Sequence, residues 1–328
     1  MSKNSGQKTV SVVLCIYNGA KYLREQLDSI VNQSLLPDEL IIQDDGSTDD
    51  TVAIVREYAE KYDFIKFFTN EAMHGVNYNF FSAMQRAKGD FIAISDQDDI
   101  WEDKKLEWQM EAIGNHLLCS GVSEPFPSEG CDLRLPNYSL LRLIYVGSSL
   151  PGHTLLFPRR LLELIPDVSA PPTVRMYDVI IAFVASSYDK VVYLDKTLVH
   201  HRVHDQSATY TAPQNYRKSP LNLFRHAVKD LKLAIELRPK VKDFQTRFLH
   251  YILKIKSSEK QYQEAVTMLR LQTSSSFLDF VRLQFFCVRH CDQLFYAKEK
   301  KTLFTRLRGW FFPISCYEYY RHFLNRKE

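Results

Sequence analysis

The sequence is poor in glycine and lacks the cysteine spacing of common metal sites. Glycine makes up only 11 of the 328 residues. No Gly-x-Gly-x-x-Gly motif follows the first apolar run, which argues against an oxidoreductase that binds a dinucleotide. The first predicted turn holds a single glycine, Gly19, whereas nucleotidyltransferases normally open with a glycine-rich phosphate loop. None of the 6 cysteines belongs to a Cys-x-x-Cys pair, so neither a zinc ribbon nor a dithiol redox site is expected.

Long hydrophobic runs are also missing. A helix that crosses a bilayer needs about 18 or more consecutive apolar residues, and no such run occurs. Residues 1–8 are polar and do not resemble a secretory signal, and the apolar run at Val10 is typical of a strand. We therefore expect the protein in the cytoplasm.

Charge is divided unevenly along the chain, although the net charge is only +3. Residues 1–213 hold 19 Lys and Arg against 29 Asp and Glu, whereas residues 214–328 hold 23 against 10. This division predicts two parts with different partners. An acidic first part suits a metal-dependent site, and a basic, aromatic-rich second part suits an anionic surface.

Short apolar runs alternate with helical periodicity over the first hundred residues. This alternation predicts an α/β fold with a mostly parallel sheet flanked by helices. Residues 120–139 are rich in Pro, Gly, Ser and Glu and are expected to form a loop, and the chain after Thr209 is expected to be helical. Ser47 precedes Asp50 by three residues, which predicts a capping box at a helix start. Strands are expected at 10–16, 40–42, 64–68, 91–95, 155–157 and 190–194, and helices around 23–31, 52–59, 80–87, 106–113 and 177–186.

Polar side chains follow the ends of the first four predicted strands. These segments are residues 17–19, residues 44–47, Asn70 and residues 96–99. In doubly covered parallel sheets, ligands bind beyond the carboxyl ends of the strands. We therefore expect the four segments to meet at one edge of the sheet and to form the binding site.

The last of these segments, Asp-Gln-Asp-Asp at 96–99, is the most informative. Three carboxylates directly after a buried strand repel one another and resist desolvation unless a positive charge lies among them. A hard divalent cation, Mg2+ or Mn2+, prefers carboxylate and phosphate oxygens. The segment therefore predicts an enzyme with a metal cofactor and a phosphorylated substrate.

Three motifs, in their order and spacing, resemble those of family 2 glycosyltransferases of the GT-A fold. They occupy residues 12–19, 42–49 and 89–99. The form Asp-Gln-Asp-Asp-Ile-Trp resembles bacterial members of the rhamnosyltransferase-like group. The resemblance covers roughly residues 8–210, which implies a GT-A catalytic domain at 1–213. Residues 214–328 would then be a basic, aromatic-rich helical extension.

The resemblance implies transfer of a sugar from a nucleotide-diphosphate donor with inversion at the anomeric carbon. Asp45 matches the family's second-strand acid, which would hydrogen-bond the base of the donor. Asp96 and Asp98 match the acidic metal motif, with Asp98 as the direct metal ligand and Asp96 on the donor side. Asp178 matches the late acid that acts as catalytic base, although Tyr177 stands where the family usually has Glu or His.

Five further residues complete the candidate site. Asp99 would bind hydroxyl groups of the donor sugar or the metal. Arg202 and His204 match the family's late basic segment, and we assign Arg202 to the donor diphosphate and His204 to the metal. Tyr17 and Asn70 are assigned to donor binding because they follow the first and third predicted strands.

The residue types suit this chemistry. The leaving nucleoside diphosphate gains negative charge, which a divalent ion and a nearby Arg or His stabilise in the transition state. The acceptor hydroxyl loses a proton as it attacks, and a carboxylate is the usual general base. A single displacement needs one such base, whereas a double displacement would need a nucleophile.

The substrates and the role of the basic extension follow less directly. The donor is expected to be dTDP-rhamnose or a UDP-hexose, and the acceptor a glycan or a lipid-linked glycan in bacterial surface polysaccharide assembly. Arginines interleave with aromatic residues at 277–286 and 304–323, which is typical of an amphipathic helix on a lipid surface. We therefore expect peripheral attachment to the inner face of the cytoplasmic membrane, with an ordinary solvated helix face as the alternative.

Two other functions remain open. The same fold could serve as a non-catalytic scaffold that binds sugar or membrane, or as a nucleotidyltransferase. Nucleic-acid binding is not expected, because the basic extension carries no recognised module for it.

Overall fold

The computed structural model describes residues 8–71, 73–126, 138–146, 150–168, 175–203, 220–295, 300–317 and 320–321. The chain forms two compact units. Unit 1 comprises Met1–Cys131, Leu150–Ala185 and Lys190–Thr211, and unit 2 comprises Asp132–Ser149, Ser186–Asp189 and Ala212–Glu328.

Unit 1 is built on an 8-stranded sheet in the order β3-β2-β1-β4-β7-β6-β8-β5. The first four strands in this order are parallel, as the alternation of strands and helices predicted. β7 and β5 run antiparallel to their neighbours, so the sheet is mixed. The strands are β1 (Val10–Ile16), β2 (Glu39–Asp44), β3 (Ile65–Thr69), β4 (Phe91–Ser95), β5 (Ile100–Trp101), β6 (Leu118–Phe126), β7 (Leu156–Pro158) and β8 (Val191–Arg202).

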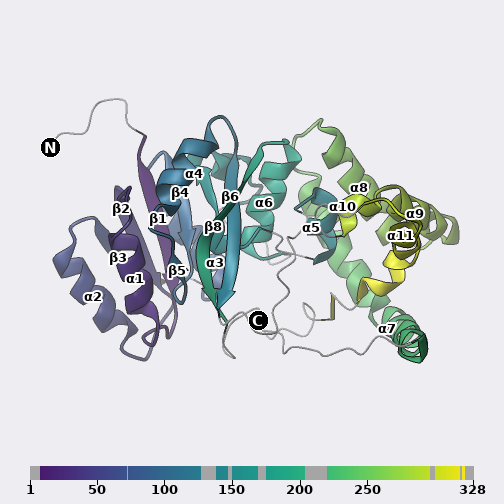
Figure 1. Cartoon of the computed structure of the whole chain (residues 1–328), viewed down its shortest axis with the longest axis horizontal. Helices are drawn as coiled ribbons and strands as arrows, with labels where there is room; N and C mark the ends of the chain where they lie inside the picture. The colour runs from purple at the N-terminus through teal and green to yellow at the C-terminus, as the bar shows by residue number, and fades with distance from the viewer. Residues whose placement is uncertain are drawn as a thin grey trace. The chain divides into compact units, whose positions relative to one another are not determined.

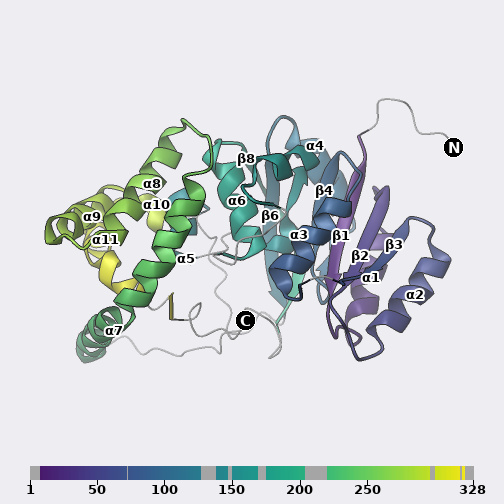
Figure 2. The same cartoon turned by 180° about the vertical axis from the view of Figure 1, so that it is seen from behind.

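Helices cover both faces of this sheet. Val12 and Leu14 of β1 belong to one core cluster with Leu27 of α1 and Val55 of α2. Alternate residues of a strand point to opposite faces, and α3 packs on the face opposite α1 and α2 (Figures 1 and 2). The helical elements are α1 (Leu23–Val31), α2 (Thr51–Lys61), α3 (Val76–Arg86), α4 (Lys105–Ile113), α6 (Tyr177–Ser187) and the 3-10 helices η1 (Gly152–Thr154) and η2 (Arg159–Leu164).

The loop predicted at 120–139 is wrong for its first part. Residues 120–126 belong to β6, which pairs in parallel with β8 over its whole length. The register shifts on both sides of Val122, which allows a segment with poor strand propensity to keep its pairing. Residues 127–137 of the predicted loop lie outside the described residues.

The capping box predicted at Ser47 is also wrong. α2 begins at Thr51, and its N-cap Asp50 makes no side-chain capping bond. Ser47 instead donates its hydroxyl to Asp44 Oδ1 at 2.5 Å. The Asp-Gly-Ser turn therefore uses its polar side chains to shape the loop that follows β2.

Unit 2 is helical in its described residues, as predicted for the basic part of the chain, although residues 204–219 lie outside the description. Tyr145 of α5 packs against Phe312 of α11 with ring centroids 4.7 Å apart. No described helix combines the length and hydrophobicity needed to cross a membrane. The helices are α5 (Leu140–Val146), α7 (Pro220–Ile252), α8 (Lys260–Thr273), α9 (Phe277–Arg289), α10 (Cys291–Leu294) and α11 (Leu303–Ser315).

The described cysteines are all free and buried, and they are Cys15 and Cys119 in unit 1 and Cys287, Cys291 and Cys316 in unit 2. Burial raises the pKa of Cys119 and of Cys287 to about 12. These thiols therefore act as core side chains, as the sequence suggested for Cys287 and Cys291.

Candidate active site

The carboxyl ends of β1, β2 and β4 lie side by side. Ile16 of β1 pairs with Asp44 of β2, and Leu14 pairs with Ser95 of β4. The loops that follow these strands therefore leave the sheet at one edge, as the order of the polar segments predicted.

Asn18 connects the loop after β1 to the loop after β2. Its φ of 46° lies in the left-handed region, which Asn tolerates better than most residues. Its N–H donates to Ser47 Oγ at 2.9 Å, and its side-chain oxygen accepts the N–H of Thr48 at 2.8 Å. These bonds fix the loop that presents Tyr17, which is 56% exposed and can meet a ligand.

Gln97 connects the loop after β1 to the acidic segment after β4. Its side-chain oxygen accepts the N–H of Tyr17 at 2.8 Å, and its side-chain nitrogen donates to the Tyr17 carbonyl at 3.1 Å. A Cβ at Gly19 would lie 2.4 Å from Gln97 Oε1, so the missing side chain at Gly19 leaves room for this amide.

Asp45 lies in a nest of donors after β2. Its Oδ1 accepts Asn70 Nδ2 at 2.7 Å and lies 3.1 Å from His74 Nδ1. Its Oδ2 accepts the N–H of Gly75 at 2.8 Å. A carboxylate has about four lone-pair sites, so these contacts hold Asp45 in place and leave acceptor capacity for a ligand.

Asp96, Asp99 and two histidines form a compact group of charges after β4. His153 Nδ1 lies 3.1 Å from both Asp96 Oδ2 and Asp99 Oδ2, and His201 Nδ1 lies 2.9 Å from Asp99 Oδ1. The two imidazoles stack with centroids 5.0 Å apart. Ligand atoms of Asp99, His153 and His201 all lie within 4.8 Å of one another, which is the spacing of a metal site.

Charge balance explains how Asp99 and His153 stay buried in this group. Burial alone would raise the pKa of Asp99, but the charge of His153 and the hydrogen bond from His201 outweigh it and lower the pKa. Burial alone would lower the pKa of His153, but the carboxylates of Asp99 and Asp96 outweigh it and raise the pKa. These two shifts favour an ionised Asp99 carboxylate next to a protonated His153.

Two acidic sites, here called the two acidic nests, lie on either side of the end of β1. One is Asp45 with its donors, and the other is the group of Asp96 and Asp99. Burial, followed by the charges of Asp96 and Asp45, raises the pKa of the Cys15 thiol well above its ordinary value. Cys15 is in β1, so carboxylates from the loops after β4 and β2 both act on it. β1 pairs with β2 on one side and with β4 on the other, so the loops that carry Asp45 and Asp96 leave the sheet on either side of its end.

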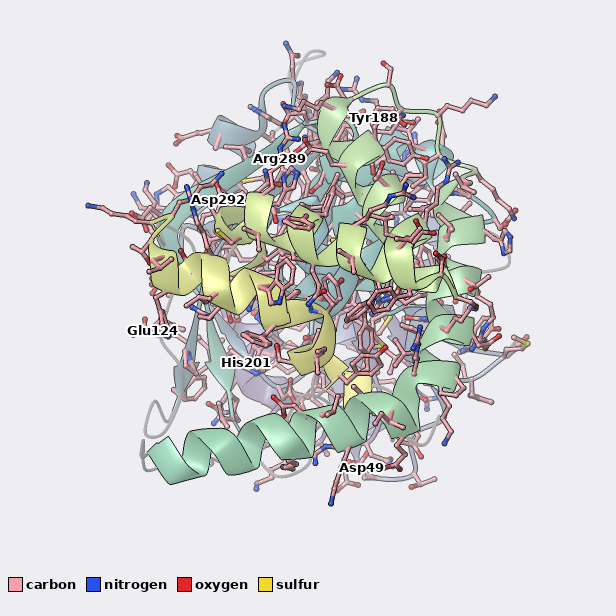
Figure 3. The ribbon with its side chains drawn as sticks, turned by 90° about the vertical axis from the view of Figure 1, so that its right-hand side faces the viewer. Asp49, Glu124, Tyr188, His201, Arg289 and Asp292 are labelled. Atoms are coloured by element: carbon pink, nitrogen blue, oxygen red, sulfur yellow. The ribbon has the colours of Figure 1, made fainter. Side chains whose placement is uncertain are left out.

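Arg202 closes one side of the acidic group from the end of β8. Its N–H donates to Asp99 Oδ1 and its Nε donates to the Asp98 carbonyl, both at 3.0 Å. Its Nη2 pairs with Glu25 of α1 at 2.7 Å. Figure 3 labels His201, the preceding residue of the same strand.

Tyr177 fixes the start of α6 to the same group. Its ring stacks on Phe80 with centroids 3.9 Å apart, and its hydroxyl donates to Asp96 Oδ1 at 3.4 Å. A Cβ at Gly152 would lie 2.1 Å from this hydroxyl, so glycine is required there. Asp178 follows in the first turn, where its Oδ1 accepts the N–H of Val179 at 2.8 Å.

The structure brings most of the predicted site residues to one edge. Hydrogen bonds and the ion pair between His153 and Asp99 join Asp96, Asp99 and Arg202 into one group with the histidines. Asp45 and Asn70 form the neighbouring nest. Tyr17 is connected to this edge through its hydrogen bond with Gln97, and Asp98 through the bond from Arg202 to its carbonyl. Asp178 follows Tyr177, whose hydroxyl bonds to Asp96. His204 lies outside the described residues.

Sequence reasoning missed two residues of the site. His153 is absent from the predicted site, yet it lies between two of the predicted acids. His74 is likewise absent from the predicted site, yet its Nδ1 lies 3.1 Å from Asp45 Oδ1. Neither histidine belongs to a motif, and Pro151-Gly152 before His153 was the only local signal of a tight turn.

Two solved structures share this fold. It resembles S. aureus TarS 1–349 solved with UDP-GlcNAc, with a TM-score of 0.57, 18% identity and coverage of 95% of this chain and 91% of that chain. It also resembles the mannosyltransferase PcManGT of Pyrobaculum calidifontis solved with GDP-Man and Mn2+, with a TM-score of 0.52, 18% identity and coverage of 99% and 89%. These identities bear on the fold alone, which is the GT-A glycosyltransferase fold.

The sequence carries a domain of known family. Residues 11–135 match the model of glycosyl transferase family 2. The rhamnosyltransferase-like specificity stays a prediction.

Curated relatives share this domain. The putative glycosyltransferase EpsE of Bacillus subtilis is 40% identical over 114 residues, which are 34% of this chain and 41% of that protein. The cholesterol galactosyltransferase of Borreliella burgdorferi is 35% identical over 114 residues, 34% of this chain and 32% of that protein. The match thus spans less than half the length of these two relatives. An uncharacterized glycosyltransferase of Rickettsia typhi is 28% identical over 230 residues, 65% of this chain and 69% of that protein.

Proposed function

We propose that this protein is an inverting, metal-dependent glycosyltransferase. It moves a sugar from a nucleotide-diphosphate donor to a hydroxyl group of a glycan or glycolipid. The observation that carries the proposal is the meeting of Asp96 and Asp99 with His153 and His201 at the carboxyl edge of a family 2 domain. A group of charges at this edge suits recognition of a charged diphosphate and is costly without a ligand.

The donor lies across the two acidic nests in this proposal. Asp45 hydrogen-bonds the base, and Asn70 holds that carboxylate through its 2.7 Å bond. Tyr17 contributes the exposed side chain of the loop after β1. Asp96 and Arg202 lie on the diphosphate and sugar side, where the guanidinium stabilises the charge that develops on the leaving group.

Asp178 is the general base in this proposal. The acceptor hydroxyl attacks the anomeric carbon from the side opposite the leaving diphosphate, and Asp178 takes its proton as the new bond forms. One displacement inverts the anomeric configuration. The anchoring of Tyr177 to Asp96 and Phe80 supports this role, because it fixes the first turn of α6 next to the acidic group.

The residues present fit a divalent cation. Asp99 Oδ2 is buried and makes no well-aligned hydrogen bond, although His153 Nδ1 lies 3.1 Å away. Such an oxygen suits a metal ligand, and imidazole with carboxylate suits Mn2+ better than Mg2+. The cation, when bound, offsets charge on the leaving diphosphate. We assign it to Asp98, Asp99, His153, His201 and the sequence-predicted His204.

The substrates we propose are dTDP-rhamnose or a UDP-hexose as donor and a glycan or lipid-linked glycan of the bacterial surface as acceptor. A relative named cholesterol galactosyltransferase supports a lipid acceptor. We further propose a catalytic domain at 1–213 and an extension at 214–328 that holds the enzyme on the inner face of the cytoplasmic membrane. The charge division between these segments supports this location.

Donor turnover tests the proposed function. The purified full-length chain is assayed for release of nucleoside diphosphate from a panel of nucleotide sugars, with Mn2+, with Mg2+ and with a chelator. We expect metal-dependent turnover of one donor, and a loss of roughly 100-fold or more in Asp178→Asn when an acceptor is present. Asp63→Asn, in the exposed turn after α2, is the matched control and should keep full activity.

Three results would overturn parts of this proposal. Absence of metal-dependent turnover and binding for every nucleotide sugar would favour a non-catalytic scaffold. Transfer of a nucleotidyl group would favour a nucleotidyltransferase. An active Asp178→Asn variant would remove the base assignment while leaving the transferase intact.

A further inference from the structure

α11 in unit 2 is apolar on two opposite sides. Its inner side buries Gly309, Phe312 and Pro313. Its outer side exposes Leu303, Phe304, Leu307 and Phe311, with exposed fractions of 77%, 69%, 51% and 57%. A surface helix of a soluble protein normally places polar residues on the outer side. An outer side with four large apolar residues marks an interaction surface.

α9 continues this surface. Its Leu278 and Phe285 are 66% and 62% exposed, whereas Leu283 and Cys287 on its other side are buried. Phe285 packs edge to face against Trp310 of α11 with centroids 5.1 Å apart. The exposed apolar residues of both helices therefore belong to one surface, called here the α9–α11 face. Its members are Leu278, Phe285, Leu303, Phe304, Leu307 and Phe311.

Close helix packing makes the α9–α11 face rigid. A Cβ at Gly309 would lie 2.7 Å from the Cys287 carbonyl oxygen, so the helices approach backbone to backbone at this point. The face is therefore preformed, and binding to it costs little ordering of the backbone.

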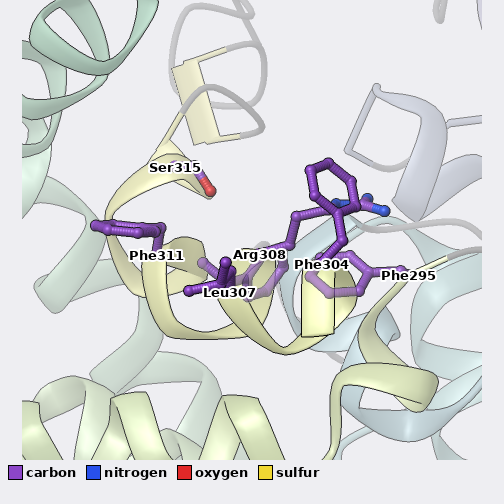
Figure 4. Close-up of a pocket in the computed structure, with 7 residues that line it drawn as sticks. Phe295, Phe304, Leu307, Arg308, Phe311 and Ser315 are labelled. Carbon is purple, nitrogen blue, oxygen red and sulfur yellow. The ribbon is translucent and has the colours of Figure 1, made fainter. Parts of the chain in front are cut away.

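A groove opens in the α9–α11 face. Phe304 and Phe311 flank it, with Leu307 and Arg308 between them in Figure 4. Its volume is about 520 Å³. Arg308 stacks its guanidinium over the Phe295 ring at 4.0 Å. An apolar groove beside a guanidinium suits a molecule with an apolar chain and an anionic head.

The charge around the face has one dominant sign. Residues 274–316 contain seven Lys and Arg against three Asp and Glu. Two of these acids are already paired: Asp279 accepts a hydrogen bond from Arg282 at 2.8 Å, and Asp292 lies 3.2 Å from Lys301 Nζ. The five other Lys and Arg of this segment outnumber its third acid, Glu299, so the remaining net charge is positive.

Exposed cations lie beside the apolar residues. Arg289, labelled in Figure 3, ends α9, Lys300 precedes α11, and Arg306 belongs to the first turns of α11. A second copy of the chain would bring the same positive charges together, which disfavours self-association through this face. An anionic bilayer provides both an apolar layer for the aromatic residues and phosphates for the cations.

We infer that the α9–α11 face is a docking surface for an anionic lipid bilayer. Phe304, Leu307 and Phe311 enter the boundary between headgroups and acyl chains. Arg306 and Arg308 hold lipid phosphates beside them. This inference rests on the membrane location proposed above and adds the residues that produce it, while it is independent of the transfer chemistry.

Vesicle flotation tests the inference on the full-length chain. The probes are vesicles of phosphatidylcholine with and without phosphatidylglycerol. We expect flotation only with the anionic lipid, and progressive release as salt rises past about 0.15 M. The double variant Phe304→Ser/Phe311→Ser should partition roughly tenfold or more weakly, and Arg306→Glu should weaken binding at low salt more than at high salt.

Matched controls separate lipid binding from folding and from catalysis. Leu36→Ser changes an apolar residue that is 49% exposed in unit 1 and should float like the unchanged chain. The face variants should keep their circular dichroism spectrum and their turnover of soluble donor. Flotation without turnover by the unchanged chain would overturn the proposed function and leave the docking surface supported.

Other outcomes would overturn the docking surface itself. These are turnover without flotation, equal binding to neutral vesicles, or unchanged flotation of the double variant. A double variant that turns a dimer into a monomer without changing flotation would identify a second copy as the occupant instead.

Discussion

The side-chain amide of Gln97 pairs with the backbone of Tyr17 through two hydrogen bonds, much as a neighbouring strand residue would. Its oxygen accepts the Tyr17 N–H at 2.8 Å, and its nitrogen donates to the Tyr17 carbonyl at 3.1 Å. Gln97 lies between two acids that we assign to the donor and the metal, Asp96 and Asp98. The pair therefore fixes the loop after β1 to the acidic segment.

We predict that Gln97→Ala loosens this connection without unfolding the chain. Two net hydrogen bonds of about 1 kcal/mol each correspond to roughly a thirtyfold effect. Because the pair positions the donor-binding loop, the loss should appear mainly as a higher KM for the donor. Steady-state kinetics and thermal melting measure both effects. A lower melting temperature with unchanged KM and kcat would limit Gln97 to a structural role.

Asp45→Asn is expected to weaken donor binding by roughly 10- to 100-fold, because hydrogen bonds to a charged group are worth about 1.5 to 3 kcal/mol. The substitution also places an amide group among Asn70 Nδ2, His74 and the N–H of Gly75, which all contact the carboxylate now. Calorimetric titration with the nucleoside diphosphate of the active donor measures the change. If Asp45→Asn and the unchanged chain bound the nucleoside diphosphate with equal affinity, Asp45 would not be the residue that binds the nucleotide base of the donor.

Removal of a histidine from the charged group should weaken metal binding. We expect His201→Gln to lower Mn2+ affinity by at least about tenfold, because it removes one candidate ligand and the hydrogen bond to Asp99. Titration followed by the paramagnetic signal of free Mn2+ measures this directly. His116→Gln is the control, because His116 lies outside the charged group, between α4 and β6. Identical Mn2+ affinities in the two variants would exclude His201 as a ligand.

Protonation of Glu39 in acid should lower the free energy of unfolding of unit 1. Its carboxylate accepts Ser11 Oγ at 2.7 Å, the Lys88 N–H at 2.6 Å and Lys66 Nζ at 2.5 Å. Burial alone would raise the pKa of Glu39, but these hydrogen bonds and the Lys66 charge outweigh it, so the pKa lies below its ordinary value of 4.5. The stabilisation is therefore present above pH 4.5 and is lost as pH falls through the lowered pKa.

Denaturant unfolding at a series of pH values measures this effect. Glu39→Gln should lower the free energy of unfolding near neutral pH by about 1 to 3 kcal/mol and flatten its decline in acid. Glu57→Gln, which loses an exposed ion pair with Arg24, should leave the free energy of unfolding almost unchanged. A parallel decline in all three proteins would contradict the role of Glu39.

The sequence predicted the edge of the sheet well because local periodicity determines it. The strands that end at Ile16, Asp44 and Ser95 were recognisable from short apolar runs, and parallel pairing then brings their loops together. The side chains that enter the site from later in the chain depend on strand pairing between distant segments. His153 reaches Asp96 across 57 residues because the antiparallel strand β7 pairs with β4. A strand was expected at 155–157, where β7 lies, but its antiparallel pairing with β4 was not predicted.

β6 is a second case in which strand pairing between distant segments could not be predicted from local sequence. Gly121, Ser123 and Pro125 favour a loop by propensity, yet their backbone pairs with β8. The pairing places Ser123 Oγ 2.8 Å from His153 Nε2, so the misread segment holds a residue of the site. Tertiary pairing outweighed propensity at the point where the prediction failed.

The buried cysteines can report local unfolding of the chain, because their thiols become accessible only when the structure around them opens. Cys15 and Cys119 belong to unit 1, and Cys287, Cys291 and Cys316 belong to unit 2. A maleimide reaches such thiols only after the surrounding structure opens. Labelling followed by peptide mass analysis would therefore report which half of the chain loosens first on heating, without any engineered probe.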